Sequence, residues 1–258
     1  MILTKTTTIS SVSSTTVHLE EYQNDNVKKT FDPDCMPIIL QDAVEKEWQF
    51  LNALPWEGKT ILDIGVGQGR HALKYAPQSE KYIGVDIAED MINTTRKSAE
   101  KHGIQNIYLI HSDAEFLDDV PGDSVDRVLC MYFTAGNFRK DNFNVAKYEK
   151  GEITKNEKFI AILRHMYRIL KKGSIYLTVY KQCTATKNMQ FEFYSKTGQH
   201  ILNAHTNDPF MATKEGFWSL RFTKELMLGN LAHVGIRPDQ VVFHDLNEIS
   251  WIVEISKQ

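Results

Sequence analysis

Short apolar runs alternate with amphipathic segments through most of the chain. The runs have the length and side-chain bulk of buried strands, and the first of them leads into Asp63. Further strands are predicted for residues 81–87, 107–114, 124–133 and 174–180. The segments between them carry apolar residues at helical spacing. Strands that alternate with helices predict a parallel sheet with helices on both faces.

The predicted helices have recognisable ends. Residues 42–54 form the first of them, with Asp42 as its N-cap. Another helix begins at Asn156, and Thr223 caps the last one. Three glycines follow helical segments and are predicted to end them: Gly103, Gly173 and Gly235.

Residues 181–222 break this alternation. Their apolar and polar residues alternate at period two, which predicts an antiparallel hairpin or a three-stranded flap inserted after the fifth strand. The segments concerned are residues 189–195, 198–205 and 216–222. Beyond the flap, residues 240–246 and 249–256 form two predicted last strands, joined by a short turn at Asn247.

The composition narrows the class of protein. With 258 residues, 42% of them hydrophobic, the chain fits one large α/β domain or two small ones. A net charge of −3 gives no general reason to bind nucleic acid or an anionic membrane, and no apolar run approaches the ~20 residues of a membrane span. The three cysteines lie far apart, which indicates a reducing compartment and neither a disulfide framework nor a zinc site. We see no secretory signal and expect a cytoplasmic protein.

The stretch Thr60–Ala72 carries the chemistry. Its sequence, T-I-L-D-I-G-V-G-Q-G-R-H-A, predicts a buried strand, a tight glycine turn and the start of a helix. Glycine tolerates positive φ and has no Cβ to hold a ligand away from the backbone. The unpaired N–H groups of the helix start could hold an anionic or strongly polar group. A dinucleotide fingerprint, G-x-G-x-x-G, would need its third glycine where Arg70 stands.

The pattern D-x-G-x-G-x-G, followed by G-R-H, resembles motif I of the class I S-adenosylmethionine (SAM)-dependent methyltransferases. The segment Gly84–Ile92, G-V-D-x-x-x-x-M-I, resembles motif II of the same family. The resemblance covers residues 42–258 and is sharpest over 61–138. It implies a Rossmann-like α/β fold, with a doubly wound, mostly parallel seven-stranded sheet whose last strand is antiparallel. It also implies SAM as cofactor and S-adenosylhomocysteine as product.

The same resemblance assigns a cofactor site. Asp86 is placed to accept hydrogen bonds from two ribose hydroxyls, with a helix N-cap as its alternative role. Asp113 resembles the acid that accepts a hydrogen bond from the adenine amino group, or it caps a loop. Asp63 would orient the glycine loop or meet the cofactor's ammonium group, and Arg70 would meet its carboxylate or point to solvent. The full set is Asp63, Gly65, Gly67, Gly69, Arg70, Asp86, Ile87, Met91, Asp113, Ala114 and Cys130.

Substrate-facing residues are expected at the exit of the fourth strand. Tyr132 and Asn137 are placed there, with core packing and a turn as their respective alternatives. His71, His111 and His205 are candidates for a general base. We count Tyr132, Asn137 and His205 as the candidate catalytic residues.

The chain divides into a tail and a domain. Residues 1–18 are rich in serine and threonine, and such a tract cannot bury enough apolar surface to order itself. Because many relatives close the pocket with N-terminal residues, we assign residues 1–41 as a tail and candidate lid, with Tyr22 as its contact. Residues 42–258 are the methyltransferase domain, in which the flap of residues 181–222 would select the substrate.

The resemblance implies methyl transfer from SAM to nitrogen or oxygen of a small-molecule metabolite by in-line displacement. The N-P-P-Y or D-P-P-Y tetrapeptide of the amino-methylating DNA enzymes is absent, which weighs against base methylation. We expect no metal, no nucleic-acid or membrane partner, and a monomer or homodimer. Two alternatives stay open: an NAD(P)-dependent oxidoreductase and a non-catalytic SAM-binding module.

Overall fold

A computed structural model describes residues 24–140, 143–147 and 150–258 of the chain. The serine- and threonine-rich tract and Tyr22, the candidate lid contact, lie outside these ranges. None of the helices within them has both the length and the apolar content that a membrane span requires.

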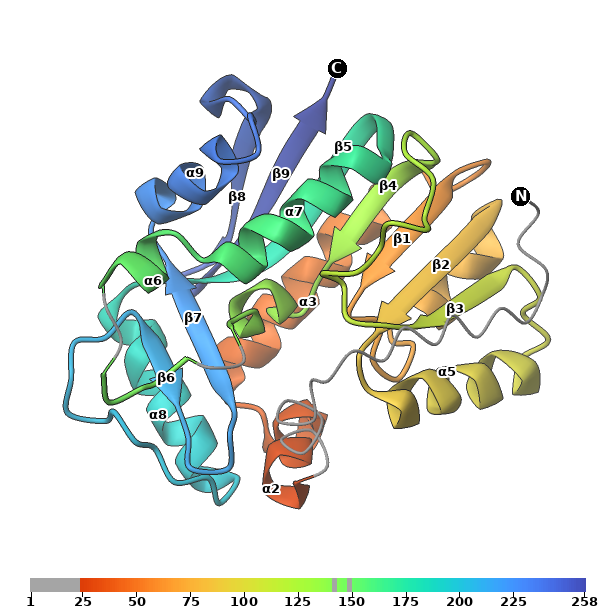
Figure 1. Ribbon diagram of the computed structural model, residues 1–258. Coiled ribbons are helices and arrows are strands. Elements are labelled where there is room, and N and C mark those ends of the chain that lie inside the picture. The colour runs from red at the N-terminus through yellow and green to blue at the C-terminus, as the bar shows by residue number, and fades with distance from the viewer. Residues whose placement is uncertain (1–23, 141–142, 148–149) are drawn as a thin grey trace.

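A single sheet organises the molecule (Figure 1). Five parallel strands form its centre, in the order β3 (Ile107–His111), β2 (Lys81–Asp86), β1 (Thr60–Ile64), β4 (Val125–Cys130) and β5 (Leu170–Lys181). The chain's last strand, β9 (Ser250–Lys257), pairs antiparallel with β5, and β8 (Val241–Asn247) pairs antiparallel with β9. These seven strands form the predicted doubly wound sheet with an antiparallel last strand, so the predicted fold class is confirmed. The predicted strand number is too low, because two strands of the inserted segment extend the sheet of the described residues to nine.

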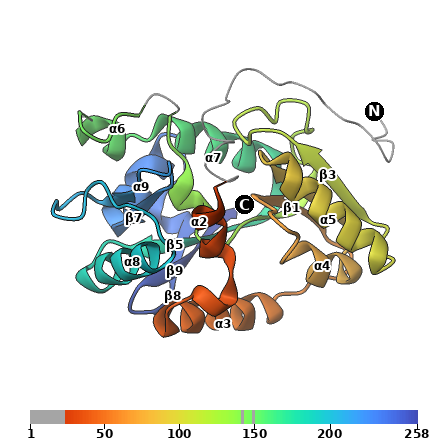
Figure 2. The same cartoon turned by 90° about the horizontal axis from the view of Figure 1, so that it is seen from below.

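Helices cover both faces of the sheet, and the view in Figure 2 separates the two layers. On one face, α3 (Ile38–Asn52), α4 (Ala72–Tyr75) and α5 (Glu89–Lys101) enclose an apolar cluster with Trp56 and Tyr82. On the other face, α7 (Glu157–Ile169) and α9 (Lys224–Ala232) pack on β4, β5 and β9. The caps predicted for these two helices are confirmed: the side chain of Asn156 accepts from the Phe159 amide, and that of Thr223 from the Leu226 amide.

The predicted flap is only partly a sheet. Residues 184–196 form a helix, α8 (Thr184–Lys196), in place of the strand predicted for 189–195. The period-two alternation misled because Phe191 is exposed, while the buried positions recur at helical spacing. What remains is the hairpin of β6 (Phe210–Ala212) and β7 (Trp218–Phe222), and β7 pairs in parallel with the end of β5. Residues 198–205 contribute an isolated bridge from Ile201 to Thr213.

The start of α3 also differs from the prediction. The helix begins at Ile38, directly after Pro37, so Asp42 lies inside it and is not its N-cap. Proline suits that boundary because its fixed φ is helical and it has no N–H to leave unpaired. The Asp42 carboxylate instead accepts from the side chains of Lys46 and Asn247, each at 2.9 Å.

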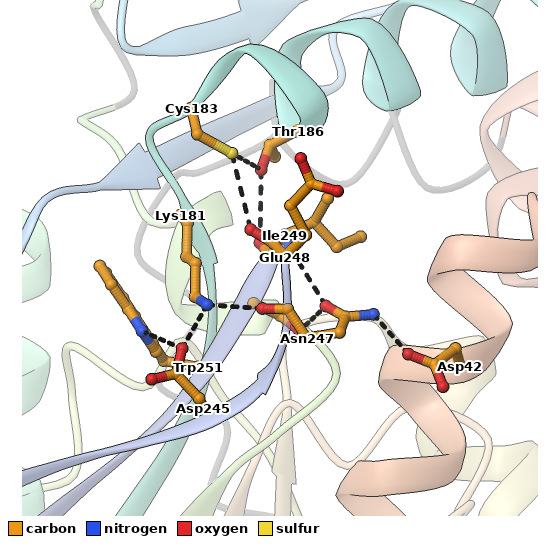
Figure 3. A network of polar contacts seen from close by, with 10 residues as sticks. Asp42, Lys181, Cys183, Thr186, Asp245, Asn247, Glu248, Ile249 and Trp251 are labelled. Carbon is orange, nitrogen blue, oxygen red and sulfur yellow. Dashed lines mark hydrogen bonds and ion pairs between the residues drawn. The ribbon is translucent and has the colours of Figure 1, made fainter.

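Asn247 ties the β8–β9 turn to α3, as Figure 3 shows. Its Nδ2 donates to Asp42 and to the Ile39 carbonyl, and its Oδ1 accepts from the amide of Ile249 at 3.1 Å. The turn between the last two strands thereby fixes the position of α3.

Gly173 does not end a helix. The preceding helix, α7, ends at Ile169 and runs straight into β5, so this glycine lies inside the strand. A Cβ at Gly173 would come 2.2 Å from the backbone oxygen of Asp126 on β4. The residue therefore serves close packing of two strands. Gly103 and Gly235 do follow helices and have positive φ.

A carboxylate is buried between β1 and β2. Asp63 is 1% exposed, and its Oδ2 accepts a hydrogen bond of 2.8 Å from the hydroxyl of Tyr82. Burial raises the pKa of Asp63 to about 6, against the opposing effects of His71 and of the Tyr82 hydrogen bond.

We expect Gly173→Ala to lower the free energy of unfolding by about 2–3 kcal/mol, because the strands cannot separate to admit the methyl group without losing hydrogen bonds. Gly229 on α9 is the matched control, since a Cβ there meets nothing within 4 Å. Gly229→Ala should stabilise the protein by ~0.5–1 kcal/mol. Urea denaturation of both variants measures the difference, and equal effects would contradict the close packing at Gly173.

We expect Asp63→Asn to remove a pH dependence of stability. Since the folded protein holds the proton up to about pH 6 and the unfolded chain releases it near pH 4, the wild type loses stability relative to the variant as the pH rises between these values. The loss amounts to about 3 kcal/mol at neutral pH, from roughly two pH units at 1.36 kcal/mol each. Urea denaturation from about pH 4 to about pH 7 tests this, and a constant difference would show that Asp63 ionises normally.

Candidate functional site

A cleft opens at the carboxyl ends of the parallel strands. It contains about 1310 Å³ of space, including its open mouth, and is lined by residues that follow β1, β2, β3 and β4 and by the first turn of α7. Open α/β sheets bind their ligands at this edge, where the strand order reverses on either side of β1.

The glycine loop after β1 forms one wall of the cleft. Gly65, Gly67 and Gly69 all have positive φ, as a turn of this shape requires. Gly65 and Gly67 line the cleft, and a Cβ at Gly65 would come 2.5 Å from Thr134. Gly69 does not line it; a Cβ there would collide with Thr95 on α5 at 2.9 Å. The first two glycines therefore bare the backbone to a ligand, and the third allows packing.

Asp86 connects this loop to the end of β2. Its Oδ2 accepts from the amide of Gly67 at 2.8 Å and its Oδ1 from the amide of Ala88 at 2.9 Å. Burial raises the pKa of Asp86, and these amide hydrogen bonds act in the opposite direction. A carboxylate has about four acceptor positions, so the two that remain can receive a ligand's hydroxyls in the cleft. Asp86 thus fixes the loop, meets the start of α5 and lines the cleft.

Asp113 lines the same cleft beyond the end of β3. Its Oδ1 accepts from the Glu115 amide at 3.0 Å, and its Oδ2 lies 2.5 Å from Nζ of Lys158. Both side chains of this ion pair are 8% exposed. The sequence interpretation missed Lys158, although a signal was present: a lysine in the first turn of α7 faces the positive end of the helix dipole and needs an acidic partner. Ala114, Ile87 and Met91 line the cleft as expected.

Arg70 does not point to solvent. Its guanidinium carbon lies 4.6 Å from the ring centre of Tyr132 and 5.1 Å from that of Trp48, and the side chain lines the cleft. Such contacts hold a cation in place through the negative ring faces. The carboxylate of a ligand bound beside the glycine loop would therefore lie near the Arg70 guanidinium.

The exit of β4 has a strained backbone. Tyr132 and Phe133 have φ of 52° and 63°, a left-handed region that costs bulky residues about 1–3 kcal/mol each. The Tyr132 ring lines the cleft, as does Asn137 at the end of the 3₁₀ turn η4 (Thr134–Asn137). Burial raises the pKa of Tyr132 to about 12, with Arg70 acting against it. Its hydroxyl contacts Sδ of Met36 at 3.5 Å, so the segment before α3 reaches the cleft wall.

Glu47 is the buried hub behind this wall. It projects from α3, is 1% exposed, and accepts from Nε2 of His71 at 3.0 Å, from Oγ1 of Thr178 at 2.5 Å and from the amide of Tyr132 at 3.0 Å. Burial alone would raise the pKa of Glu47, but these hydrogen bonds and the His71 charge together lower it below its usual value. The sequence interpretation missed Glu47. The signal was an acid on the apolar face of an amphipathic helix, four residues before Leu51.

Four residues assigned to the site do not line the cleft. His205 is exposed in the loop before β6, because residues 198–205 do not form the strand that was to fold over the pocket. Cys130 is fully buried on the opposite face of β4 from Met131, which does line the cleft; neighbouring residues of a strand point to opposite faces. Asp63 and Gly69 lie behind the loop. His111, a further base candidate, bonds to the Ile87 carbonyl.

The described part of the N-terminal segment lies near the cleft. The short helix α2 (Asp25–Lys28) lies beyond the carboxyl edge of the sheet in both views (Figures 1 and 2). Val27 and Met36 pack in one apolar cluster with Phe133 and with residues of α8. These contacts join the first described residues to the strained turn after β4.

Known proteins share this arrangement. Residues 61–145 match the methyltransferase domain family. The uncharacterized methyltransferase YcgJ of Bacillus subtilis is 36% identical over 72 residues, 28% of each chain. A tRNA (guanine-N(7)-)-methyltransferase of Chlorobium phaeobacteroides is 30% identical over 100 residues, 37% of this chain and 48% of that one. The chain thus spans less than half the length of these curated relatives.

The fold has solved counterparts over almost its whole length. The 1,6-didemethyltoxoflavin-N1-methyltransferase of Burkholderia thailandensis, crystallised with 1,6-didemethyltoxoflavin and S-adenosylhomocysteine, superposes with a TM-score of 0.57. The match covers 96% of this chain and 92% of that one at 12% identity, so it speaks for the fold alone. The domain match includes the glycine loop and both acids, so residues 61–145 match a methyltransferase domain, and the superposition extends the methyltransferase fold over nearly the whole chain.

Proposed function

We propose that the protein transfers a methyl group from SAM to nitrogen or oxygen of a small-molecule metabolite. One observation carries the proposal: Asp86 and Asp113, which follow two neighbouring parallel strands, face one cleft together with the bare backbone of Gly65 and Gly67.

The residues present fit SAM part by part. The two open acceptor positions of Asp86 suit the vicinal hydroxyls of a ribose. Asp113 and the backbone of Ala114 suit the adenine edge, with Ile87 and Met91 as apolar contacts. Arg70, held between two aromatic rings, suits the carboxylate of the methionine half. The cleft therefore offers oxygen acceptors for the ribose and the adenine, and a cation for the carboxylate.

The chemistry demands little beyond positioning. Bound SAM supplies a methyl group already activated by its positive sulfur. The chain must align an acceptor behind that methyl and exclude water, and alignment alone can contribute ~7–11 kcal/mol. Tyr132 and Asn137 line the cleft past the glycine loop, and we assign them to the acceptor's side of the site.

A small acceptor is favoured over RNA. The Burkholderia protein was crystallised with a small acceptor, whereas the Chlorobium relative acts on tRNA and matches only 100 residues. A net charge of −3 offers little attraction for a polyanion. Three separate free cysteines support the cytoplasm as compartment. In this proposal residues 1–41 act as a lid over the pocket, and residues 181–222 select the substrate.

Calorimetric titration tests the cofactor. We expect SAM and S-adenosylhomocysteine to bind with Kd of about 1–100 µM, and Asp86→Ala to weaken both about 10–100-fold, since a charged hydrogen-bond acceptor is lost. Asp90→Ala is the matched control: Asp90 is an exposed acid in the first turn of α5 and should leave Kd unchanged. Binding of NADH with enhanced fluorescence, and none of SAM, would replace the proposal with an NAD(P)-dependent oxidoreductase.

Transfer tests the acceptor class. SAM with a labelled methyl group is incubated with the protein and either a small-metabolite extract or total tRNA. We expect label in the metabolite fraction and none in tRNA above a no-enzyme blank. Label in tRNA alone would overturn the small-molecule assignment. Tight SAM binding without transfer to either pool would identify a non-catalytic SAM-binding module.

A further inference from the structure

We propose that His71 takes the acceptor's proton during methyl transfer, and that Glu47 is the positioning residue that holds His71 for this task. The inference rests on the proposed function, since it needs an N–H or O–H acceptor in the cleft.

The first observation is the number of donors around Glu47. One carboxylate oxygen, Oε2, accepts from a hydroxyl, that of Thr178, and from a backbone amide, that of Tyr132. The other, Oε1, is left for the imidazole of His71 at 3.0 Å. A buried carboxylate with three donors is stabilised in its ionised form, and the lowered pKa of Glu47 agrees with this.

The ionised carboxylate fixes the imidazole tautomer. A carboxylate has no hydrogen to donate, so Nε2 of His71 must carry one, and in the neutral ring the lone pair then resides on Nδ1. No group among the described residues bonds to Nδ1, and this atom is not fully buried. Since the ring also lines the cleft, Nδ1 is the nitrogen that a ligand there can reach. Side-chain exposure of only 7% keeps bulk water away from the ring.

The surroundings stabilise the charge that His71 would gain. Two carboxylates act on it: Glu47 from α3, which bonds to the ring, and Asp63 from β1, whose charge interacts with that of His71, while Asp86 at the end of β2 lines the same cleft. Two cations lie on the same ring of Trp48 that packs beside His71: Arg70, which also contacts Tyr132, and Lys74, whose Nζ is 4.4 Å from the ring centre. The neutral ring of Trp48 packs beside His71, with 4.9 Å between the ring centres.

The step balances without any further reagent. The proton leaves the acceptor's O–H or N–H bond for the lone pair of Nδ1. The acceptor atom keeps the electron pair of that bond and uses it to bind the methyl carbon. Sulfur keeps the pair of the broken S–C bond and becomes a neutral thioether. The positive charge thus passes from sulfur to the imidazole, opposite Glu47, as a carboxylate-held histidine can accept it.

Glu47 does a second positioning task with its other oxygen. The amide of Tyr132, which it accepts, begins the left-handed turn after β4. The same carboxylate therefore positions two residues that line the cleft, His71 and Tyr132. If Glu47 served only to stabilise the fold, the direction of Nδ1 of His71 toward the cleft would have no explanation.

Nuclear magnetic resonance tests the tautomer in the free protein, without SAM. Two-bond ¹H–¹⁵N spectra distinguish protonated from unprotonated ring nitrogens, and the His71 signals are those missing in His71→Gln. We expect protonated Nε2 and unprotonated Nδ1 above the titration midpoint, and a midpoint that moves to lower pH in Glu47→Gln. A protonated Nδ1 in the neutral ring, or a midpoint unchanged in Glu47→Gln, would overturn the assignment.

The matched control is a second histidine–glutamate pair outside the cleft. His244 and Glu254, on β8 and β9, lie 2.9 Å apart and are partly exposed. Glu254→Gln should leave the His71 signals in place and shift those of His244 alone. Movement of the His71 signals in this variant would show that the change reflects the whole fold rather than Glu47.

Kinetics complete the test with an acceptor found in the transfer screen. We expect His71→Gln to lower kcat about 10²–10⁴-fold, the usual contribution of a general base, while the calorimetric Kd for SAM stays within about threefold. In Glu47→Gln the acidic limb of the rate profile should move to lower pH. Unchanged kcat in His71→Gln refutes the base, and this variant decides the matter even where Glu47→Gln does not fold. Absence of SAM binding by the wild type would instead refute the proposed function, with the resonance result unaffected.

Discussion

The hydrogen bond from the Gly67 amide to the Asp86 carboxylate is the constraint on which the cleft depends. It joins the loop after β1 to the end of β2, within a turn in which Gly67 adopts a positive φ that a residue with a Cβ would avoid. With the loop held in this way, Gly65 and Gly67 present backbone without side chains, and the same carboxylate keeps two acceptor positions for a ligand. Replacing Gly67 with a larger residue, or removing the Asp86 carboxylate, would disturb both the bare backbone of the loop and the acceptor positions offered to a ligand.

A second buried carboxylate organises the opposite half. Glu47 is far from the loop in sequence, yet it binds residues of three other segments: the start of α4, the exit of β4 and the middle of β5. Burying a charge costs free energy unless it is fully hydrogen-bonded, so the three donors are a condition for its presence and also the means by which it fixes their positions. The strain at Tyr132 and Phe133 persists because one of these donors is the Tyr132 amide.

Local patterns determined how much could be predicted from the sequence. The parallel strands, the glycine turn and the acids at 86 and 113 were predictable because each follows from a few neighbouring residues. Cys130 was misplaced by one position of strand alternation, and Gly173 was taken for a helix stop because a glycine required by close strand packing has the same local pattern. Residues 189–195 form a helix and not the predicted strand. Aromatic residues at alternate positions suggested a strand, but on the helix one of them, Phe191, is exposed. Glu47 and Lys158 could be found only as charged residues at unfavourable positions: an acid on the apolar face of a helix, and a lysine in the first turn of another.

This difference in locality divides the cleft into two halves with different freedom to change. The part of the cleft that suits the cofactor is built by consecutive βα turns within residues 61–145, the range that matches the methyltransferase domain family. The part that we assign to the acceptor, at Tyr132 and Asn137, lies in the same range but is supported from outside it. Glu47 of α3, itself bonded to Thr178 of β5, holds the Tyr132 amide, and Phe133 packs with residues of α8. A substitution in these supporting elements can shift the wall around Tyr132 while the bonds of Asp86 to Gly67 and Ala88 stay in place. His71 is where the two parts meet: it belongs to the loop by sequence and to Glu47 by contact, so a proton acceptor there would keep its relation to the methyl donor while the acceptor wall around it changes.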